Sequence, residues 1–146
     1  LHNPLARLLE LGALPVINEN DPISTEEYSL GDNDRLGALI AKYTHADLLV
    51  LLSDIDGLYT ADPHKDPDAA RIELVPEITD EILRLADGKG SELGTGGMKT
   101  KLSAAKIVTK AGTDMIIANG AEVEKLYALL DGKSIGTRFL GRKASV

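Results

Sequence analysis

The sequence of 146 residues contains no cysteine. The absence of thiols excludes disulfide bridges, thiolate zinc sites, iron–sulfur clusters and cysteine nucleophiles. A chain of this length buries about two-thirds of the surface that its unfolded form exposes, so it can form a core without such cross-links. We expect a single domain over residues 1–146, without a second domain, in the reducing environment of the cytoplasm.

Aromatic residues and positive charge are also scarce. Trp is absent, there are one Phe and four Tyr, and the net charge is −7 at pH 7. Proteins that bind nucleic acid use a basic surface and aromatic platforms for the bases, so nucleic acid is not expected as a partner. No membrane span is expected either. The longest apolar run, from Leu48 to Leu52, is far shorter than the roughly 20 residues that a span requires.

Apolar periodicity predicts that helices and strands alternate along the chain. Helices are expected at 1–12, 32–43, 79–85, 98–111 and 122–130, and strands at 14–17, 47–52, 114–118 and 136–140. The run at 47–52 is continuous rather than alternating, as in a strand covered on both faces. We expect a small hairpin within 58–76 and a long loop at 18–31. The pattern is typical of an α/β domain with a mostly parallel sheet, whose ligands bind beyond the carboxyl ends of the strands.

A glycine-rich segment at 94–101 (GTGGMKTK) opens the helix expected at 98–111. Exposed N–H groups of glycines, followed by a helix N-terminus, form an arrangement that binds anions. Lys101 would lie in the first turn of this helix, where a cation is unfavourable unless an anion is also present. The segment has neither the Walker A spacing nor, because of Lys99, the glycines of a dinucleotide fingerprint. By composition alone it is equally well a flexible surface loop with solubilising lysines.

Acidic and amide side chains gather in loops beside the expected strands. They are Asn18, Glu19, Asn20, Asp21, Asp32, Asn33 and Asp34. The mixture suits an ammonium group, a magnesium–phosphate complex or a catalytic lysine, although turns and helix capping explain much of it. Ser53 and Asp54 follow the most apolar strand, where they either bind a nucleotide or simply lead into a turn at Gly57. Because EF-hand spacing fails from both Asp32 and Asp54, no metal ligands are assigned to the protein.

In these motifs the sequence resembles the amino acid kinase superfamily, and within it the glutamate 5-kinases. The matching segments are 15–21 (PVINEND), 31–34 (GDND), 51–63 (LLSDIDGLYTADP) and 94–101 (GTGGMKTK), in the order and spacing of the family. The resemblance covers nearly the whole chain and implies a three-layer αβα sandwich with a mostly parallel sheet. It implies transfer of the γ-phosphoryl group of ATP, with Mg²⁺ carried mainly by the nucleotide, to the side-chain carboxylate of L-glutamate. In the family this is the first step of proline biosynthesis.

The resemblance also implies roles for individual residues. Asp21 and Asn33 match the positions that hold glutamate. The positions that hold ATP are matched by Ser53, Asp54, Thr95, Gly96, Gly97, Met98, Lys99, Thr100 and Lys101. Asp34 resembles the family's aspartate that orients catalytic lysines, and Lys101 resembles one of the lysines that neutralise the transferred group.

The family pattern starts with a strand, a lysine and a phosphate-binding loop that precede the part matched by this sequence. The resemblance therefore implies a truncated chain that is inactive or nearly so by itself and prone to associate through an unpaired sheet edge. It also implies a homo-oligomer whose loop at 18–31 takes part in inhibition by proline. Two alternatives stay open. One is a sister kinase acting on acetylglutamate or aspartate, and the other is a noncatalytic nucleotide-binding or oligomerising module.

Overall fold

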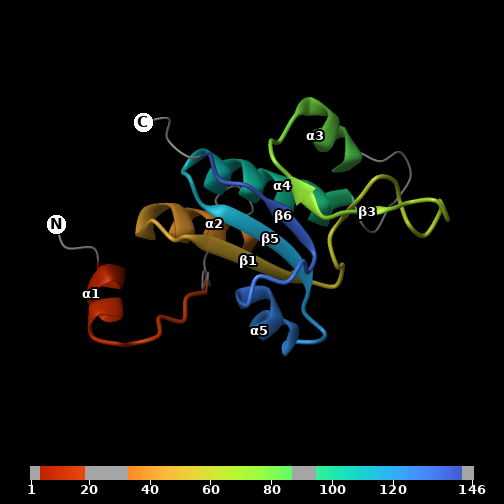
Figure 1. Ribbon diagram of the computed structural model, residues 1–146. Coiled ribbons are helices and arrows are strands. Elements are labelled where there is room, and N and C mark those ends of the chain that lie inside the picture. The colour runs from red at the N-terminus through yellow and green to blue at the C-terminus, as the bar shows by residue number, and fades with distance from the viewer. Residues whose placement is uncertain (1–3, 19–32, 87–94, 143–146) are drawn as a thin grey trace, which may run out of the picture.

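The computed structural model describes residues 4–18, 33–86 and 95–142. The helices are α1 (Pro4–Glu10), α2 (Asn33–Thr44), α3 (Asp80–Ala86), α4 (Thr95–Lys110) and α5 (Lys125–Leu130). The strands are β1 (Leu48–Ser53), β2 (Leu58–Tyr59), β3 (Arg71–Ile72), β4 (Leu74–Val75), β5 (Asp114–Asn119) and β6 (Thr137–Phe139). The order departs from the strict alternation expected, because α1 is followed by α2, β1 to β4 are consecutive, and α3 is followed by α4, whereas β5, α5 and β6 alternate (Figure 1). None of the described helices is both long enough and apolar enough to cross a membrane.

Four strands form one sheet in the order β1-β5-β6-β4, and β2 pairs with β3 in a separate antiparallel ribbon. β1 and β5 are parallel over their full length, from Leu48 opposite Asp114 to Ser53 opposite Asn119. β4 and β6 are also parallel, whereas β6 runs antiparallel to β5. The prediction of an α/β fold with a mostly parallel sheet is confirmed, and the ribbon accounts for the hairpin expected within 58–76.

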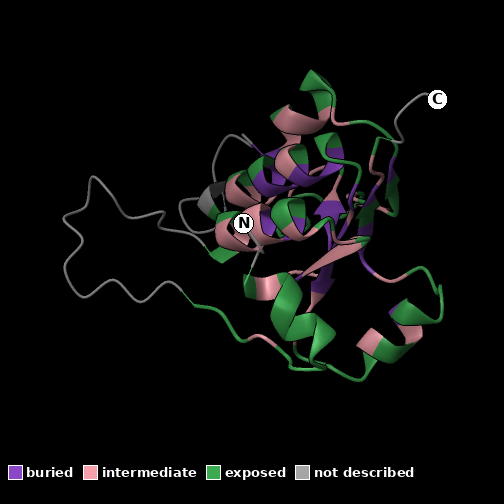
Figure 2. Ribbon diagram, turned by 90° about the vertical axis from the view of Figure 1, so that its left-hand side faces the viewer, coloured by how far each residue is buried: buried purple, intermediate pink, exposed green. Residues whose placement is uncertain are grey.

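Helices cover both faces of the sheet. Met115 and Ile117 of β5 are buried in the core that the sheet forms with α2 and α4, whereas Ile116 and Ala118 pack with Leu129 of α5. Because successive side chains of a strand point to opposite faces, these two sets define two layers of helix around one sheet. Figure 1 shows α2 and α4 on one side of β1 and β5 with α5 on the other, and the buried residues lie between the layers (Figure 2).

Small side chains bring α2 and α4 close together. Ala38 and Ala41 of α2 and Ala104 and Ala105 of α4 are all buried, with at most 5% of their surface exposed. Gly37 of α2 faces the sheet, where an added Cβ would lie 3.6 Å from the Leu49 side chain. This close apolar packing fixes the two helices side by side. It therefore sets where their first turns lie relative to the strands.

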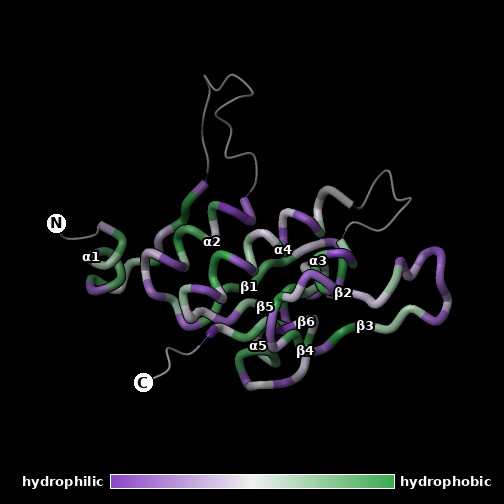
Figure 3. Tube along the Cα trace, turned by 90° about the horizontal axis from the view of Figure 1, so that it is seen from above, coloured by the Kyte–Doolittle hydropathy of each residue, from purple (hydrophilic) through white to green (hydrophobic). Residues whose placement is uncertain are grey.

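The predicted strand at 14–17 is wrong. The segment has no strand structure, and Leu14 and Val16 are 86% and 91% exposed. A strand is held by hydrogen bonds to a neighbouring strand, and none of the described strands pairs with this segment. The preceding helix α1 is correctly predicted but has no buried residue. In Figure 3 its largely hydrophobic turns lie apart from the sheet.

Candidate functional site

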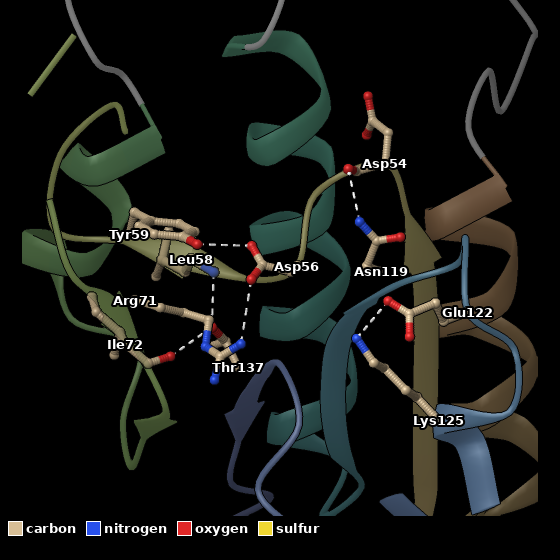
Figure 4. A network of polar contacts seen from close by, with 10 residues as sticks. All are labelled: Asp54, Asp56, Leu58, Tyr59, Arg71, Ile72, Asn119, Glu122, Lys125 and Thr137. Carbon is tan, nitrogen blue, oxygen red and sulfur yellow. Dashed lines mark hydrogen bonds and ion pairs between the residues drawn. The ribbon is translucent and has the colours of Figure 1, made fainter. Parts of the chain in front are cut away.

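The predicted site residues come from elements that meet at one edge of the sheet. α2 leads into β1 and α4 leads into β5, and these two strands are parallel. A helix that packs on a sheet and feeds the next strand runs opposite to that strand, so its first turn lies at the carboxyl end of the strand. In Figure 4 the beginnings of α2 and α4 lie at the same edge as Asp54, which follows β1.

Asp34 in the first turn of α2 and Lys101 in the second turn of α4 form an ion pair. The Lys101 Nζ atom lies 2.9 Å from Oδ2 of Asp34, and the two side chains are only 12% and 17% exposed. The Thr100 hydroxyl lies 3.2 Å from the same carboxylate oxygen and 2.8 Å from the carbonyl oxygen of Gly97, so it shares its proton between them. The structure thus brings together two residues that lie 67 positions apart in the sequence. It leaves Asn33 exposed at the start of α2.

Helix α4 begins at Thr95, three residues earlier than predicted. Gly96 and Gly97 therefore belong to its first turn, and Lys101 lies in the second. The macrodipole acts mainly within the first turn, so its unfavourable interaction with the Lys101 ammonium is weaker than the sequence predicted. Asp34 is the feature that fixes this ammonium group instead. The first four N–H groups of any α-helix have no partner within the helix, and at α4 they open towards the same edge.

The other nucleotide-binding residues predicted in α4 differ in their surroundings. Met98 packs partly buried against the main apolar core, whereas Gly97 and Lys99 are exposed. The Thr95 side chain and the exposure of Gly96 are outside what the structure describes, although the backbone of both residues is helical. Asp21 also lies outside the described residues, as do residues 19–32 as a whole. The structure consequently places the predicted ATP segment but leaves the predicted glutamate loop unplaced.

Ser53 and Asp54 lie where β1 ends. The Ser53 hydroxyl donates a hydrogen bond of 3.0 Å to Oδ1 of Asp54, whose side chain is exposed. The end of β5 holds the backbone here. The Asn119 side-chain amide donates to the Asp54 carbonyl oxygen at 3.2 Å, and the Gly120 N–H donates to the Ser53 carbonyl oxygen at 2.8 Å. Asn119 was not among the predicted site residues. A polar residue directly after the buried strand at 114–118 was the available signal.

A second group of polar contacts lies beyond the turn at Gly57, also without a sequence-based prediction (Figure 4). Asp56 accepts hydrogen bonds from the hydroxyl of Tyr59 at 2.9 Å and from Arg71 at 3.3 Å. The hydrogen bond to Asp56 raises the pKa of Tyr59 above its ordinary value. Burial and the negative charge of Asp56 act in the same direction, and the charge of Arg71 opposes them. These contacts link the two strands of the β2–β3 ribbon to the turn that leaves β1.

Thr137 of β6 anchors the ribbon to the sheet. Its hydroxyl accepts a 2.8 Å hydrogen bond from the Leu58 N–H and donates one of 2.6 Å to the Ile72 carbonyl oxygen. Gly57 has a φ of 155°, and a Cβ at this position would lie 2.5 Å from the Thr137 hydroxyl. Glycine is thus required at position 57, because any side chain there would collide with Thr137. The segment after β1 is held on both sides, by the end of β5 and by β6.

A shallow hollow lies at the other ends of α2 and α4. Its lining includes Lys42, Lys106 and Lys110 together with Ser103, Ile107 and Ala111. These residues lie in the later turns of the helices, away from Asp34 and Lys101. Lys42 and Lys110 lie in the last turns of α2 and α4, where the helix dipole stabilises a cation. The hollow is therefore not part of the candidate site.

Residues 2–119 match the family model described as the amino acid kinase family. The chain belongs to this family. A curated relative named glutamate 5-kinase, from Agrobacterium fabrum, is 57% identical over 126 residues, which are 86% of this chain and 32% of the relative. The chain thus spans about a third of the length of such relatives.

Solved structures of the same architecture are more distant in sequence. The isopentenyl phosphate kinase of T. acidophilum, in a product complex, matches with a TM-score of 0.65 and 24% identity over 93% of this chain and 51% of that one. The carbamate kinase of Giardia lamblia, bound to AMP-PNP, matches with a TM-score of 0.56 and 27% identity over 76% and 36% of the two chains. These likenesses agree with the α/β fold described above.

Proposed function

We propose that the full-length protein is a glutamate 5-kinase, which transfers the γ-phosphoryl group of ATP to the side-chain carboxylate of L-glutamate. The products are ADP and L-glutamyl 5-phosphate, an acyl phosphate from which proline can be made. The observation that carries the proposal is the ion pair of Lys101 with Asp34 beside the first turn of α4. The identity to relatives of that name and the four matching segments support the choice of acceptor.

The chemistry that this reaction demands agrees with the geometry of the site. A carboxylate is already ionised at neutral pH, so the nucleophile needs no general base. The protein then needs only to align the two substrates and to neutralise the charge on the phosphoryl group during its transfer. The Lys101 ammonium supplies positive charge, and its bonds to Asp34 keep it in one place. The N–H groups at the start of α4 supply fixed dipoles at the same edge.

The remaining assignments follow from this arrangement. Ser53, Asp54 and residues 95–101 hold ATP in the proposal, and Asp21 with Asn33 holds glutamate. Mg²⁺ enters with the triphosphate, because this ion commonly binds through substrate phosphates while keeping several waters. Its contribution when bound is to offset the negative charge of the phosphate oxygens. A homo-oligomeric state, inhibition by proline and a cytoplasmic location stay predictions from the sequence.

The proposal is tested by trapping the acyl phosphate. Full-length protein is incubated with ATP, Mg²⁺ and hydroxylamine, and the hydroxamate is quantified with L-glutamate, N-acetyl-L-glutamate or L-aspartate as acceptor. We expect hydroxamate from L-glutamate at a kcat/KM at least tenfold above that of the other acceptors. Preference for acetylglutamate or aspartate would assign a sister kinase. Nucleotide binding without any hydroxamate would favour a noncatalytic module.

The 146-residue chain alone is expected to give little or no hydroxamate in the same assay. The relatives are about three times as long, and a phosphoryl group in transfer needs charge on more than one side. Activity of the isolated chain that approaches that of the full-length protein would contradict this expectation.

A further inference from the structure

Asn119, the last residue of β5, uses both ends of its side-chain amide. Its Nδ2 donates to the carbonyl oxygen of Asp54 at 3.2 Å, and its Oδ1 accepts from the Ala121 N–H at 2.8 Å. One bond crosses to the neighbouring strand, and the other closes a turn within its own segment. An amide side chain carries its donor and its acceptor on separate atoms and is suited to this bridge, whereas a carboxylate has no donor for the Asp54 carbonyl.

The backbone beside Asn119 reinforces the same connection. Asn119 is opposite Ser53 in the parallel register, and the next N–H, that of Gly120, donates to the Ser53 carbonyl oxygen at 2.8 Å. A Cβ at Gly120 would lie 3.2 Å from the Cβ of Leu52, so the chain leaving β5 passes close over the end of β1. Two successive carbonyl groups, those of Ser53 and Asp54, thus receive donors from β5.

This connection determines where the side chains of Ser53 and Asp54 point. In Figure 4 the Asn119 amide lies under the Asp54 carbonyl, and the Asp54 carboxylate points away from it, beyond the end of the strand. The Ser53 hydroxyl then orients that carboxylate by donating to its Oδ1. With its carbonyl fixed, the Asp54 side chain has only its own rotamers left to sample. Without the amide, the Asp54 carbonyl would lose this hydrogen bond and only the Gly120–Ser53 bond would still tie the segment to the end of β5.

We propose that Asn119 is a positioning residue for the nucleotide, which acts through the Asp54 backbone and touches no substrate itself. The inference rests on the proposed function, because that function is what makes Ser53 and Asp54 nucleotide ligands. It adds a residue that lies outside the segments through which the sequence resembles the kinases. It predicts that loss of the Asn119 amide weakens ATP binding selectively.

The test replaces Asn119 by residues that break the bridge in two ways. Asn119→Asp has the same size and keeps the acceptor for Ala121, but it places a carboxylate oxygen against the Asp54 carbonyl. Asn119→Ala removes both bonds without adding charge. Ala121→Asp is the matched control, because it adds a carboxylate at an exposed neighbouring position and leaves the Asn119 side chain in place. All three are made in the full-length protein.

Three experiments are carried out on each variant. A titration gives the Kd of a nonhydrolysable ATP analogue with Mg²⁺, steady-state kinetics gives kcat and the KM values for ATP and glutamate, and thermal unfolding gives the midpoint. For Asn119→Asp we expect the Kd and the KM for ATP to rise about tenfold, because one hydrogen bond is lost and the new carboxylate repels the Asp54 carbonyl oxygen. Asn119→Ala should raise them roughly threefold to fivefold. In both variants kcat and the KM for glutamate should stay within about twofold, as should all constants of Ala121→Asp.

Two results overturn the inference. One is an unchanged affinity for ATP in both Asn119 variants. The other is a parallel loss of kcat, both KM values and the thermal midpoint, which shows a purely structural role. The direct titration needs no acceptor, so it separates this test from the proposed function. If the wild-type protein binds the analogue but forms no glutamyl phosphate, the acceptor assignment fails and the role of Asn119 is still decided by the Kd values.

Discussion

The two edges of the sheet each carry a partly buried aspartate paired with a cation. At the amino end of β5, Asp114 accepts hydrogen bonds from the Arg138 guanidinium and, at 2.7 Å, from the Gly141 N–H. At the carboxyl edge, Asp34 pairs with Lys101. The first pair closes β6 and the chain that follows it onto β5. The second joins two helices that close apolar packing already holds together.

This difference separates a structural ion pair from one that indicates chemistry. Where apolar packing already fixes two elements, an added ion pair contributes little to stability, because desolvation offsets most of the Coulomb attraction. The buried alanines between α2 and α4 provide such apolar packing beside the Asp34–Lys101 pair. The Asp114 carboxylate instead satisfies a backbone N–H that would otherwise have no such partner. Substitutions at the carboxyl edge should therefore change activity more than stability, and those at the amino edge should do the reverse.

The largest effect is expected from Lys101→Ala in the full-length protein. Loss of one charge that stabilises the transferring phosphoryl group should lower kcat by about 10² to 10³. The largely buried Asp34 carboxylate loses its cation, so the unfolding free energy should also fall, but kcat is measured where the variant is still folded. Lys110→Ala is the matched control, since this lysine is exposed in the last turn of the same helix. Hydroxamate kinetics and urea unfolding measure the two quantities. A kcat that matches the control would remove the central support of the proposed function.

A smaller effect on kcat is expected from Asp34→Asn. The amide keeps the size of the carboxylate but gives up the charge that holds the Lys101 ammonium, so that group should lose its fixed position. Misplacement of one group at a reacting centre lowers the rate, and we expect a loss of about tenfold in kcat. Together with Lys101→Ala and the double variant, Asp34→Asn forms a double-mutant cycle for kcat. If the two residues act as one unit, the double variant should be no slower than Lys101→Ala alone.

The converse is expected from Asp114→Ala at the amino edge. The Gly141 N–H loses its acceptor and Arg138 loses its partner, so the unfolding free energy should fall by about 1 to 3 kcal/mol. The unfolding free energy of Asp114→Asn should fall by less, because the amide retains one acceptor oxygen. Urea unfolding gives the stabilities, and kcat measured well below the unfolding midpoint should equal that of the wild type. A tenfold loss of kcat in a stably folded Asp114→Ala protein would contradict the division between the two edges.

The sequence predicted the elements whose signals are local. The continuous apolar runs of β1 and β5 and the periodic stripes of α2 and α4 led to the correct fold class. The strand at 14–17 failed because a strand also depends on a neighbour, which the sequence of the segment does not contain. The motifs predicted Lys101 and Asp34 as site residues, but they could not show that the two side chains contact each other. Asn119 and Asp56 were missed because their roles arise from hydrogen bonds to residues that are adjacent only in the folded chain.

The smallest effect concerns the ribbon beside the carboxyl edge. The hydrogen bond to Asp56 raises the pKa of Tyr59, so the folded state favours the neutral phenol. The corresponding stabilisation is complete below the unfolded pKa of about 10 and is lost as the pH rises through the higher folded value. Tyr59→Phe removes it at every pH. The stability difference between wild type and variant should therefore be constant from about pH 7 to 9 and shrink above about pH 10.

Urea unfolding at a series of pH values measures this difference. Tyr127→Phe is the control, because this tyrosine is 75% exposed on α5, far along the chain from the ribbon. Its difference from wild type should show no such decline. If the Tyr59→Phe difference instead grew with pH, the phenolate rather than the phenol would be the form that the fold favours. Tyr59 would then be held mainly by the positive charge of Arg71 rather than by its hydrogen bond to Asp56, and the link between the ribbon and the turn after β1 would depend on the Arg71–Asp56 contact and on Thr137.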